Sequence, residues 1–102
     1  MAEGTEKEFD RRMVGIYERA KTETGYHATY FLRMLSEHGG LETARRLVGS
    51  GQPSEGFTSL YLKHRLDLTV EHLMLEEEFS DLFSVELTEI ARDRLRDYGI
   101  EK

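Results

Sequence analysis

The sequence predicts an all-α fold, a compact single-domain bundle of about six short to medium helices. Three observations lead to this prediction. Apolar residues recur every three or four positions through most of the chain, which is the spacing of helices that each bury one face. Turns rich in glycine, or containing proline, separate these stretches. No stretch alternates polar residues with apolar and β-branched ones, as a half-buried strand would.

The first helix is expected to begin near Phe9, after a flexible N-terminal segment of residues 1–8, and to end before Gly25. Gly15 lies inside it at a cost of roughly 1 kcal/mol relative to alanine. We therefore expect Gly15 to permit close approach by a neighbouring helix. The expected buried stripe is Phe9, Met13, Ile16, Tyr17 and Ala20.

A second helix over about 26–38 and a third over about 41–48 are separated by Gly39 and Gly40. Residues 49–54 contain the only proline of the chain and form the one evident loop. The core faces are expected to be Tyr30, Phe31, Met34 and Leu35 in the second helix, and Leu41, Ala44, Leu47 and Val48 in the third.

Short polar side chains mark the starts of the remaining helices. Ser54 is the expected N-cap of a fourth helix over about 54–64, Asp67 or Thr69 that of a fifth, and Ser84 that of the last. A tight corner is expected over 79–83. Residues 9–99 are thus predicted to be one helical domain, followed by a C-terminal tail of residues 100–102. The inward faces are Phe57, Leu60 and Tyr61, then Val70, Leu73 and Met74, then Leu87, Ile90, Ala91, Leu95 and Tyr98.

Composition excludes several kinds of chemistry. The chain has no cysteine, so disulfides, thiolate metal sites and cysteine nucleophiles are ruled out. No apolar run approaches the ~18 residues that span a bilayer, and the acidic N-terminus lacks the apolar core of a signal peptide, so we expect a cytoplasmic location and no membrane partner. The charge is uneven: residues 25–66 carry five basic and three acidic side chains, and residues 67–102 carry four and eleven.

No catalytic, cofactor-binding or metal-binding residue is predicted, and no cofactor. The four histidines lack the spacing of three or four convergent metal ligands. The loop at Ser50 has neither the lysine of a P-loop nor the pattern of a nucleophile elbow. The consecutive residues Glu76, Glu77 and Glu78 point in different directions from one helix, which suits a solvated or docking surface. We expect the packed helices to leave neither a cleft nor a cofactor cradle.

Basic residues of the middle third form the candidate interaction surface. A helix, a Gly-Gly turn and a second helix with Arg45 and Arg46 have the outline of a helix-turn-helix, although any two antiparallel helices share it. Arg65 and Asp67 flank an apolar residue and are expected to form a structural ion pair. The candidate partner contacts are Arg45, Arg46, Lys63 and Arg65. Together with Arg33 these residues would make a basic patch for nucleic acid, although the low pI of 5.2 argues against nucleic-acid binding.

Several segments carry a family resemblance. They are 17–20 (YERA), 39–44 (GGLETA), 56–61 (GFTSLY), 65–71 (RLDLTVE), 82–83 (LF) and 91–99 (ARDRLRDYG). Together they resemble a group of small, uncharacterised, all-helical bacterial proteins, over about residues 9–99. The resemblance implies a helical fold and brings no activity or site residue with it.

The function we expect is that of a non-catalytic protein-protein interaction module, an accessory subunit or adaptor of a bacterial cytoplasmic system. Its partner would be another protein or a second copy of itself. The alternative is a small nucleic-acid-associated or regulatory protein that uses the basic residues of the middle third. A third hypothesis is a helical enzyme with a scattered site, in which a deep pocket collects His27, His64 or His72 with carboxylates.

Overall fold

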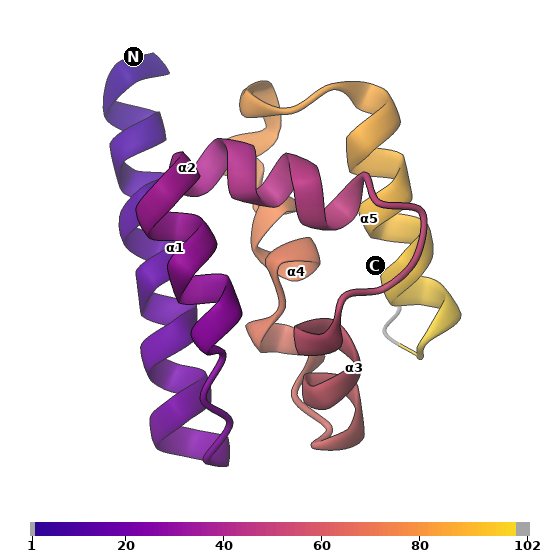
Figure 1. The fold of residues 1–102 in the computed structure, drawn as a ribbon. Helices are drawn as coiled ribbons and strands as arrows, with labels where there is room; N and C mark the ends of the chain where they lie inside the picture. Colours follow the sequence, from indigo (N-terminus) through magenta and orange to yellow (C-terminus); the bar gives the residue numbers. More distant parts are fainter. Residues whose placement is uncertain (1, 100–102) are drawn as a thin grey trace.

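The structure, a computed structural model, describes residues 2–99. Within that range there is no strand, and the all-α prediction is confirmed. Five α-helices and two short 3-10 helices follow one another (Figure 1). Because α2 bends into two arms, the described chain has six α-helical segments. None of the described helices is long and apolar enough to cross a membrane.

Helix α1 spans Ala2–Thr24 and buries the expected stripe. Phe9, Met13, Tyr17 and Ala20 are buried. From Ala2 onward the expected N-terminal segment forms the first turns of α1, because these mostly polar residues are compatible with a solvated helix. Gly25, with φ of 78°, follows the end of the helix as predicted.

Helix α2 spans Thr29–Val48 and is bent at Gly39, whose φ of 80° and ψ of 171° are not helical. Its first arm lies beside α1, and its second arm crosses towards α5 (Figure 1). The predicted break at Gly39 and Gly40 is thus present, as a corner between two arms. The helix begins three residues later than Tyr26, and no side chain caps its start at Ala28.

Gly40, and not Gly15, is the glycine at which two helices come close. A Cβ atom on Gly40 would lie 2.4 Å from the Asp10 Oδ1 atom and 3.3 Å from the Asp10 Cα atom. The same carboxylate accepts a hydrogen bond of 2.7 Å from the Gly40 N–H, so α1 caps the second arm of α2. Around Gly15 a Cβ atom would meet nothing within 4 Å. The expectation for Gly15 was wrong because a neighbour's approach depends on how helices cross.

Helix α3 spans Glu55–Leu62 and is capped by Ser54, whose Oγ atom accepts from the Phe57 N–H at 3.1 Å. It ends two residues before the predicted end. His64 then takes the left-handed conformation, with φ of 62°. The 3-10 helix η1, Leu66–Leu68, leads into α4, Val70–Met74. Of the two candidate caps for α4, Thr69 is the N-cap: its Oγ1 atom accepts a hydrogen bond from the His72 N–H.

The 3-10 helix η2, Glu77–Leu82, forms the expected corner. Helix α5, Val85–Asp97, is capped by Ser84, as the sequence predicts, and has Glu86 in its first turn. Its inner face differs in one respect: Ile90 is exposed, and Arg94 is buried instead. Tyr30 in α2 and Tyr61 in α3 are likewise exposed against expectation. Each lies at the edge of its helical stripe, and the Tyr61 ring still packs edge-on against Tyr98, which follows α5.

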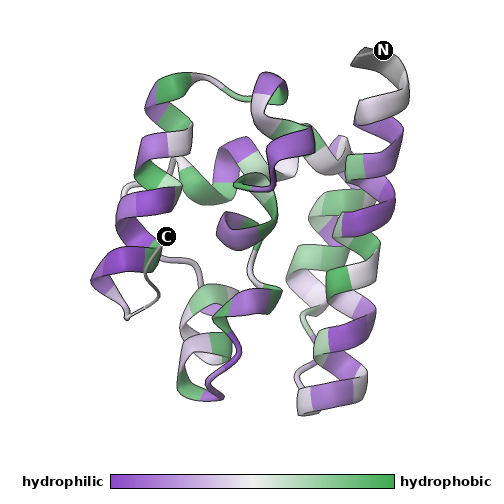
Figure 2. Cartoon of the chain, turned by 180° about the vertical axis from the view of Figure 1, so that it is seen from behind, coloured by the Kyte–Doolittle hydropathy of each residue, from purple (hydrophilic) through white to green (hydrophobic). Residues whose placement is uncertain are grey.

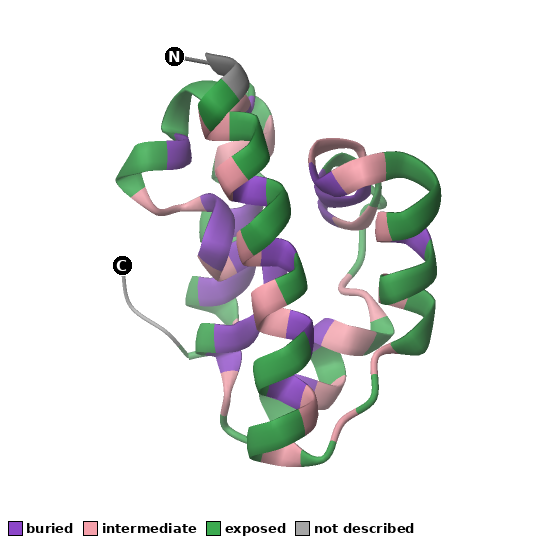
Figure 3. Ribbon diagram, turned by 90° about the vertical axis from the view of Figure 1, so that its left-hand side faces the viewer, coloured by how far each residue is buried: buried purple, intermediate pink, exposed green. Residues whose placement is uncertain are grey.

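The core consists of one large cluster and two small ones. The large cluster joins α1, α2, α4, η2 and α5, and Phe9 stands at its centre with its ring edge-on to Phe79 and Phe83. The small clusters lie under α3: one holds Leu60 and Leu68, the other Phe57. Polar residues occupy the outer faces (Figure 2), and buried residues follow the inner sides of the helices (Figure 3). Helix α3 therefore packs on small clusters that also include Ala20 of α1 and Leu95 of α5.

Candidate functional site

Arg45 and Arg46, two of the predicted contact residues, share a carboxylate on their own helix. Both are exposed on the second arm of α2. The Glu42 side chain lies 3.7 Å from the Arg45 guanidinium and 2.9 Å from that of Arg46. Part of their positive charge is thus offset locally, which weakens the attraction they can offer to a phosphate backbone.

Arg65 forms a two-point ion pair with Asp67. Its Nε and Nη2 atoms each donate a 3.0 Å hydrogen bond to an oxygen of Asp67. Its Nη2 atom also lies 2.7 Å from the Glu23 carboxylate, so Arg65 links the end of α1 to η1. The hydrogen bond from Arg65 holds the pKa of Asp67 below its usual range. The geometry is that of a structural connection, and it occupies Arg65 with two carboxylates.

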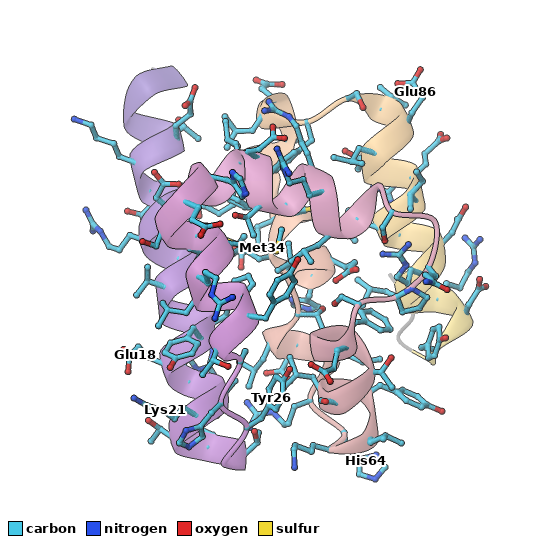
Figure 4. All side chains as sticks on the ribbon, viewed as in Figure 1. Glu18, Lys21, Tyr26, Met34, His64 and Glu86 are labelled. Carbon is cyan, nitrogen blue, oxygen red and sulfur yellow. The ribbon has the colours of Figure 1, made fainter. Side chains whose placement is uncertain are left out.

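The five basic residues of the middle third are spread over the molecule. Arg33 lies on the first arm of α2, while Arg45 and Arg46 lie on the second arm. Lys63 and Arg65 follow α3, at the lower edge of the view in Figure 1, where His64 is labelled in Figure 4. The second arm of α2 crosses the upper half of the same view. The structure does not gather these residues into one patch.

The acidic residues at the start of η2 contact α1. Arg12 pairs with Glu76 and lies 3.6 Å from Glu78, while its guanidinium is 5.8 Å from the centre of the Phe79 ring. Within residues 2–99 no group of three or more histidine, aspartate or glutamate side chains could hold a metal ion. His27 and His64 are exposed.

A pocket lies between α1, the corner of α2, α3 and the start of α4. It has a volume of about 230 Å³ and is partly open to solvent. The expectation that packed helices leave no cleft was therefore wrong. Helix α3 is short and packs on the two small clusters, so the space between it and the first arm of α2 is not filled by side chains. Tyr26, labelled in Figure 4, lies between α2 and α3 at this place.

The pocket walls are mostly apolar. Ile16 and Ala20 come from α1, and Leu47 comes from the second arm of α2. The lining residues of the pocket do not include His27, His64 or His72. The walls contain five aromatic rings, those of Tyr17, Tyr26, Tyr30, Phe31 and Phe57.

One wall of the pocket carries a buried ion pair. Glu71, in the first turn of α4, has a side chain that is 3% exposed and lies 2.8 Å from the Arg94 Nη1 atom of α5. The Nη2 atom of Arg94 donates a 3.3 Å hydrogen bond to the Val48 carbonyl. Burial raises the pKa of Glu71, and the hydrogen bond from Arg94 opposes that rise. The pair joins the ends of α2, α4 and α5 behind the pocket.

Sequence reasoning missed both the pocket and the ion pair. One signal was present: Arg94 stands three residues after Ala91, on the same helical stripe as buried apolar residues. A charged residue at such a position requires a buried partner. Glu71 could not be chosen as that partner from spacing, since 23 positions separate the two and several other carboxylates compete.

A second, shallower hollow adjoins the first. It lies inside the corner of α2 and shares the walls Tyr30 and Leu47 with the pocket. His38 and Arg46 contribute its polar side. Met34, buried in α2, forms its floor and is labelled in Figure 4. Tyr30, which lines both hollows, is exposed.

In comparisons with known proteins, no family model, no curated protein and no solved structure matches this chain. The resemblance to a group of bacterial proteins stays a prediction. Any statement on function therefore depends on the chemistry of the pocket.

Proposed function

We propose that this protein is a non-catalytic interaction module that binds a segment of another protein along the inside of α2, with one large apolar side chain of that segment inserted in the pocket. The pocket itself is the observation that supports this proposal. Its walls offer apolar and aromatic contact area, and the buried carboxylate among them, Glu71, is held by Arg94.

The size of the pocket favours an anchoring side chain over a cofactor. At about 230 Å³ it is smaller than the roughly 300–1,000 Å³ clefts that hold cofactors and drug-sized ligands. It is larger than the ~150 Å³ cavity that takes up benzene. Interfaces often concentrate their binding energy in one such pocket, filled by a large residue of the partner. The adjoining hollow can then contact the polar residues next to the anchor.

The alternative, nucleic-acid binding through the basic residues, receives less support. Arg45 and Arg46 share Glu42, and Arg65 is held by Asp67 and Glu23. Binding that depends on these residues would weaken steeply with salt. We propose protein binding because the pocket offers a place for a partner, and the ion pairs reduce what the basic residues offer to a phosphate.

Gly56 provides a direct way to block the pocket. It lines the pocket in the first turn of α3, and a Cβ atom there would make only ordinary contacts, 3.7 Å from the Tyr26 hydroxyl oxygen and 3.8 Å from the Ser54 Oγ atom. The Gly56→Leu variant should therefore fold and fill the pocket. Thr58→Leu is the matched control, because it adds the same side chain at an exposed position of the same helix.

The experiment compares proteins captured from a host lysate by the wild type, Gly56→Leu and Thr58→Leu. We expect at least one protein that the wild type and Thr58→Leu retain and Gly56→Leu does not. Calorimetry with that purified partner should show binding that is lost when one large apolar residue of the partner is replaced by alanine. Equal retention by all three proteins would contradict the proposal.

A further inference from the structure

The polar groups in the pocket wall restrict what the anchor can be. Two of them are already used in helix caps. The Ser54 Oγ atom accepts from the Phe57 N–H at 3.1 Å. The Thr69 Oγ1 atom donates to the Leu66 carbonyl at 2.7 Å and accepts from the His72 N–H at 3.2 Å. Each hydroxyl oxygen keeps one lone pair, so it can still accept a hydrogen bond from a donor that enters the pocket.

Glu71 is the remaining buried polar residue of the wall. Its Oε2 atom accepts from Arg94, and an ionised carboxylate can accept several hydrogen bonds but donate none. Glu71 lines the pocket, and the positive charge of Arg94 balances its own, so this part of the wall carries little net charge. A neutral hydrogen-bond donor suits such a wall, whereas a cation or an anion entering the pocket would lose its hydration without a free counter-charge.

The volume indicates the size of that donor group. The pocket is roughly one and a half times as large as the ~150 Å³ cavity that holds benzene. The volume of a fused two-ring system exceeds that of benzene by a similar ratio. The rings of Tyr26, Phe31 and Phe57 stand in the wall, and aromatic pairs gain from edge-to-face and offset contacts.

On these grounds we propose that the anchor is the indole of a tryptophan on the partner protein, and that its N–H donates a hydrogen bond to the Glu71 carboxylate. Indole is a donor only, it is neutral, and it has two fused rings. This inference rests on the function proposed above. A second copy of the chain cannot supply the anchor, because the sequence contains no tryptophan.

The lack of tryptophan also makes the test simple. N-acetyl-tryptophanamide is titrated with the protein, and its emission is the only tryptophan signal in the sample. We expect a shift to shorter wavelength as the indole enters the pocket. The Gly56→Leu variant should give no shift, and the Thr58→Leu variant should behave like the wild type.

The hydrogen bond is tested with indole and indene, which share a shape and differ in the N–H group, by following protein NMR shifts. We expect indole to bind wild type roughly tenfold more tightly, as a hydrogen bond to a charged acceptor implies. The double variant Glu71→Leu/Arg94→Met removes the acceptor without leaving a buried charge unpaired. In this double variant indole and indene should bind equally well, because the preference for indole is lost and binding of indene remains.

The outcomes separate this inference from the proposed function. Equal binding of indole and indene, both abolished by Gly56→Leu, would overturn the assignment of indole and leave the pocket as an apolar anchor site. A failure of both probes to bind would also overturn it. If the lysate experiment still shows a partner lost only in Gly56→Leu, the proposed function stands with a different anchor. If that experiment fails as well, both are contradicted.

Discussion

Gly40 is a glycine of α2 that lies close to the backbone of α1. Replacing it with alanine brings a Cβ atom within 2.4 Å of Asp10 Oδ1 and close to the Asp10 backbone, and it disturbs the hydrogen bond that caps the second arm of α2. We expect Gly40→Ala to lower the free energy of unfolding by about 2–3 kcal/mol. Urea denaturation measures the change.

Gly15→Ala is the matched control for this prediction. It lies inside α1 with nothing near the position of a Cβ atom, so it should gain up to about 1 kcal/mol from helix propensity. If both substitutions changed stability by the same amount and sign, close packing at Gly40 would not be the cause.

His64 is the one residue other than glycine with a positive φ among those the structure describes. It follows α3 in the position that glycine usually occupies, and the Arg65 N–H donates to the Leu60 carbonyl at 2.8 Å, as in a Schellman motif. His64→Gly should raise the free energy of unfolding by roughly 0.5–1 kcal/mol, since the strain removed exceeds the added entropy of the unfolded chain. Thermal unfolding measures the gain.

Lys63→Gly provides the comparison, because Lys63 has a negative φ of −93° and no strain of this kind. It should bring no gain or a small loss. A loss of stability in His64→Gly would mean that the imidazole makes a contact that matters more than the backbone conformation.

At the scale of helices, local signals in the sequence predicted much of the order of elements. Ser54, Thr69 and Ser84 cap helices because each is a short polar residue just before an apolar repeat. Each cap bonds to the N–H three residues later, so the signal lies within four consecutive residues and can be recognised in the sequence. The exposure of Tyr30 and the burial of Arg94 depend on which element lies opposite each helix. That information is tertiary, so helical periodicity alone gave the wrong face at these positions.

The ion pair between Glu71 and Arg94 connects three helices. Removal of one partner leaves the other charged and buried, so Arg94→Met alone should cost about 3–5 kcal/mol. The double variant Glu71→Leu/Arg94→Met should recover most of that loss, because two apolar side chains can replace a buried pair. A double-mutant cycle of urea denaturation measures the coupling, and additive effects of the two single substitutions would contradict it.

The connection between α1 and η1 should depend on pH. Because Arg65 holds the pKa of Asp67 below its usual range, the stability that Asp67 contributes is present above the unfolded pKa of about 4 and is lost as the pH falls through the lower, folded pKa. The wild type should therefore be more stable than Asp67→Asn at pH 7, with the difference lost as the pH falls through the folded pKa of Asp67. Because Asp67 is exposed, the difference should be small and should shrink with added salt. Denaturation of both proteins across this pH range, at low salt, provides the measurement.

At the scale of the whole molecule, the fold follows from the sequence and the pocket does not. Apolar stripes and turns define which segments are helices, and they place Phe9, Met13, Ala44, Val48 and Ala91 of the large cluster on inward faces. The pocket arises because α3 packs on two separate small clusters and leaves space next to α2. Whether a hollow remains between α2 and α3 depends on how closely their side chains fit together. A difference smaller than one side chain decides this, and the sequence pattern does not specify it.

Binding at this hollow is tested most directly by intermolecular nuclear Overhauser effects between a bound aromatic probe and the methyl groups of the protein. With indole in excess, we predict contacts to the methyl groups of Ile16, Leu47 and Leu60, which come from three different elements of the pocket wall. Contacts confined to exposed residues elsewhere, such as Leu62 and Val85, or no contacts at all, would contradict an anchor site between α1, α2 and α3.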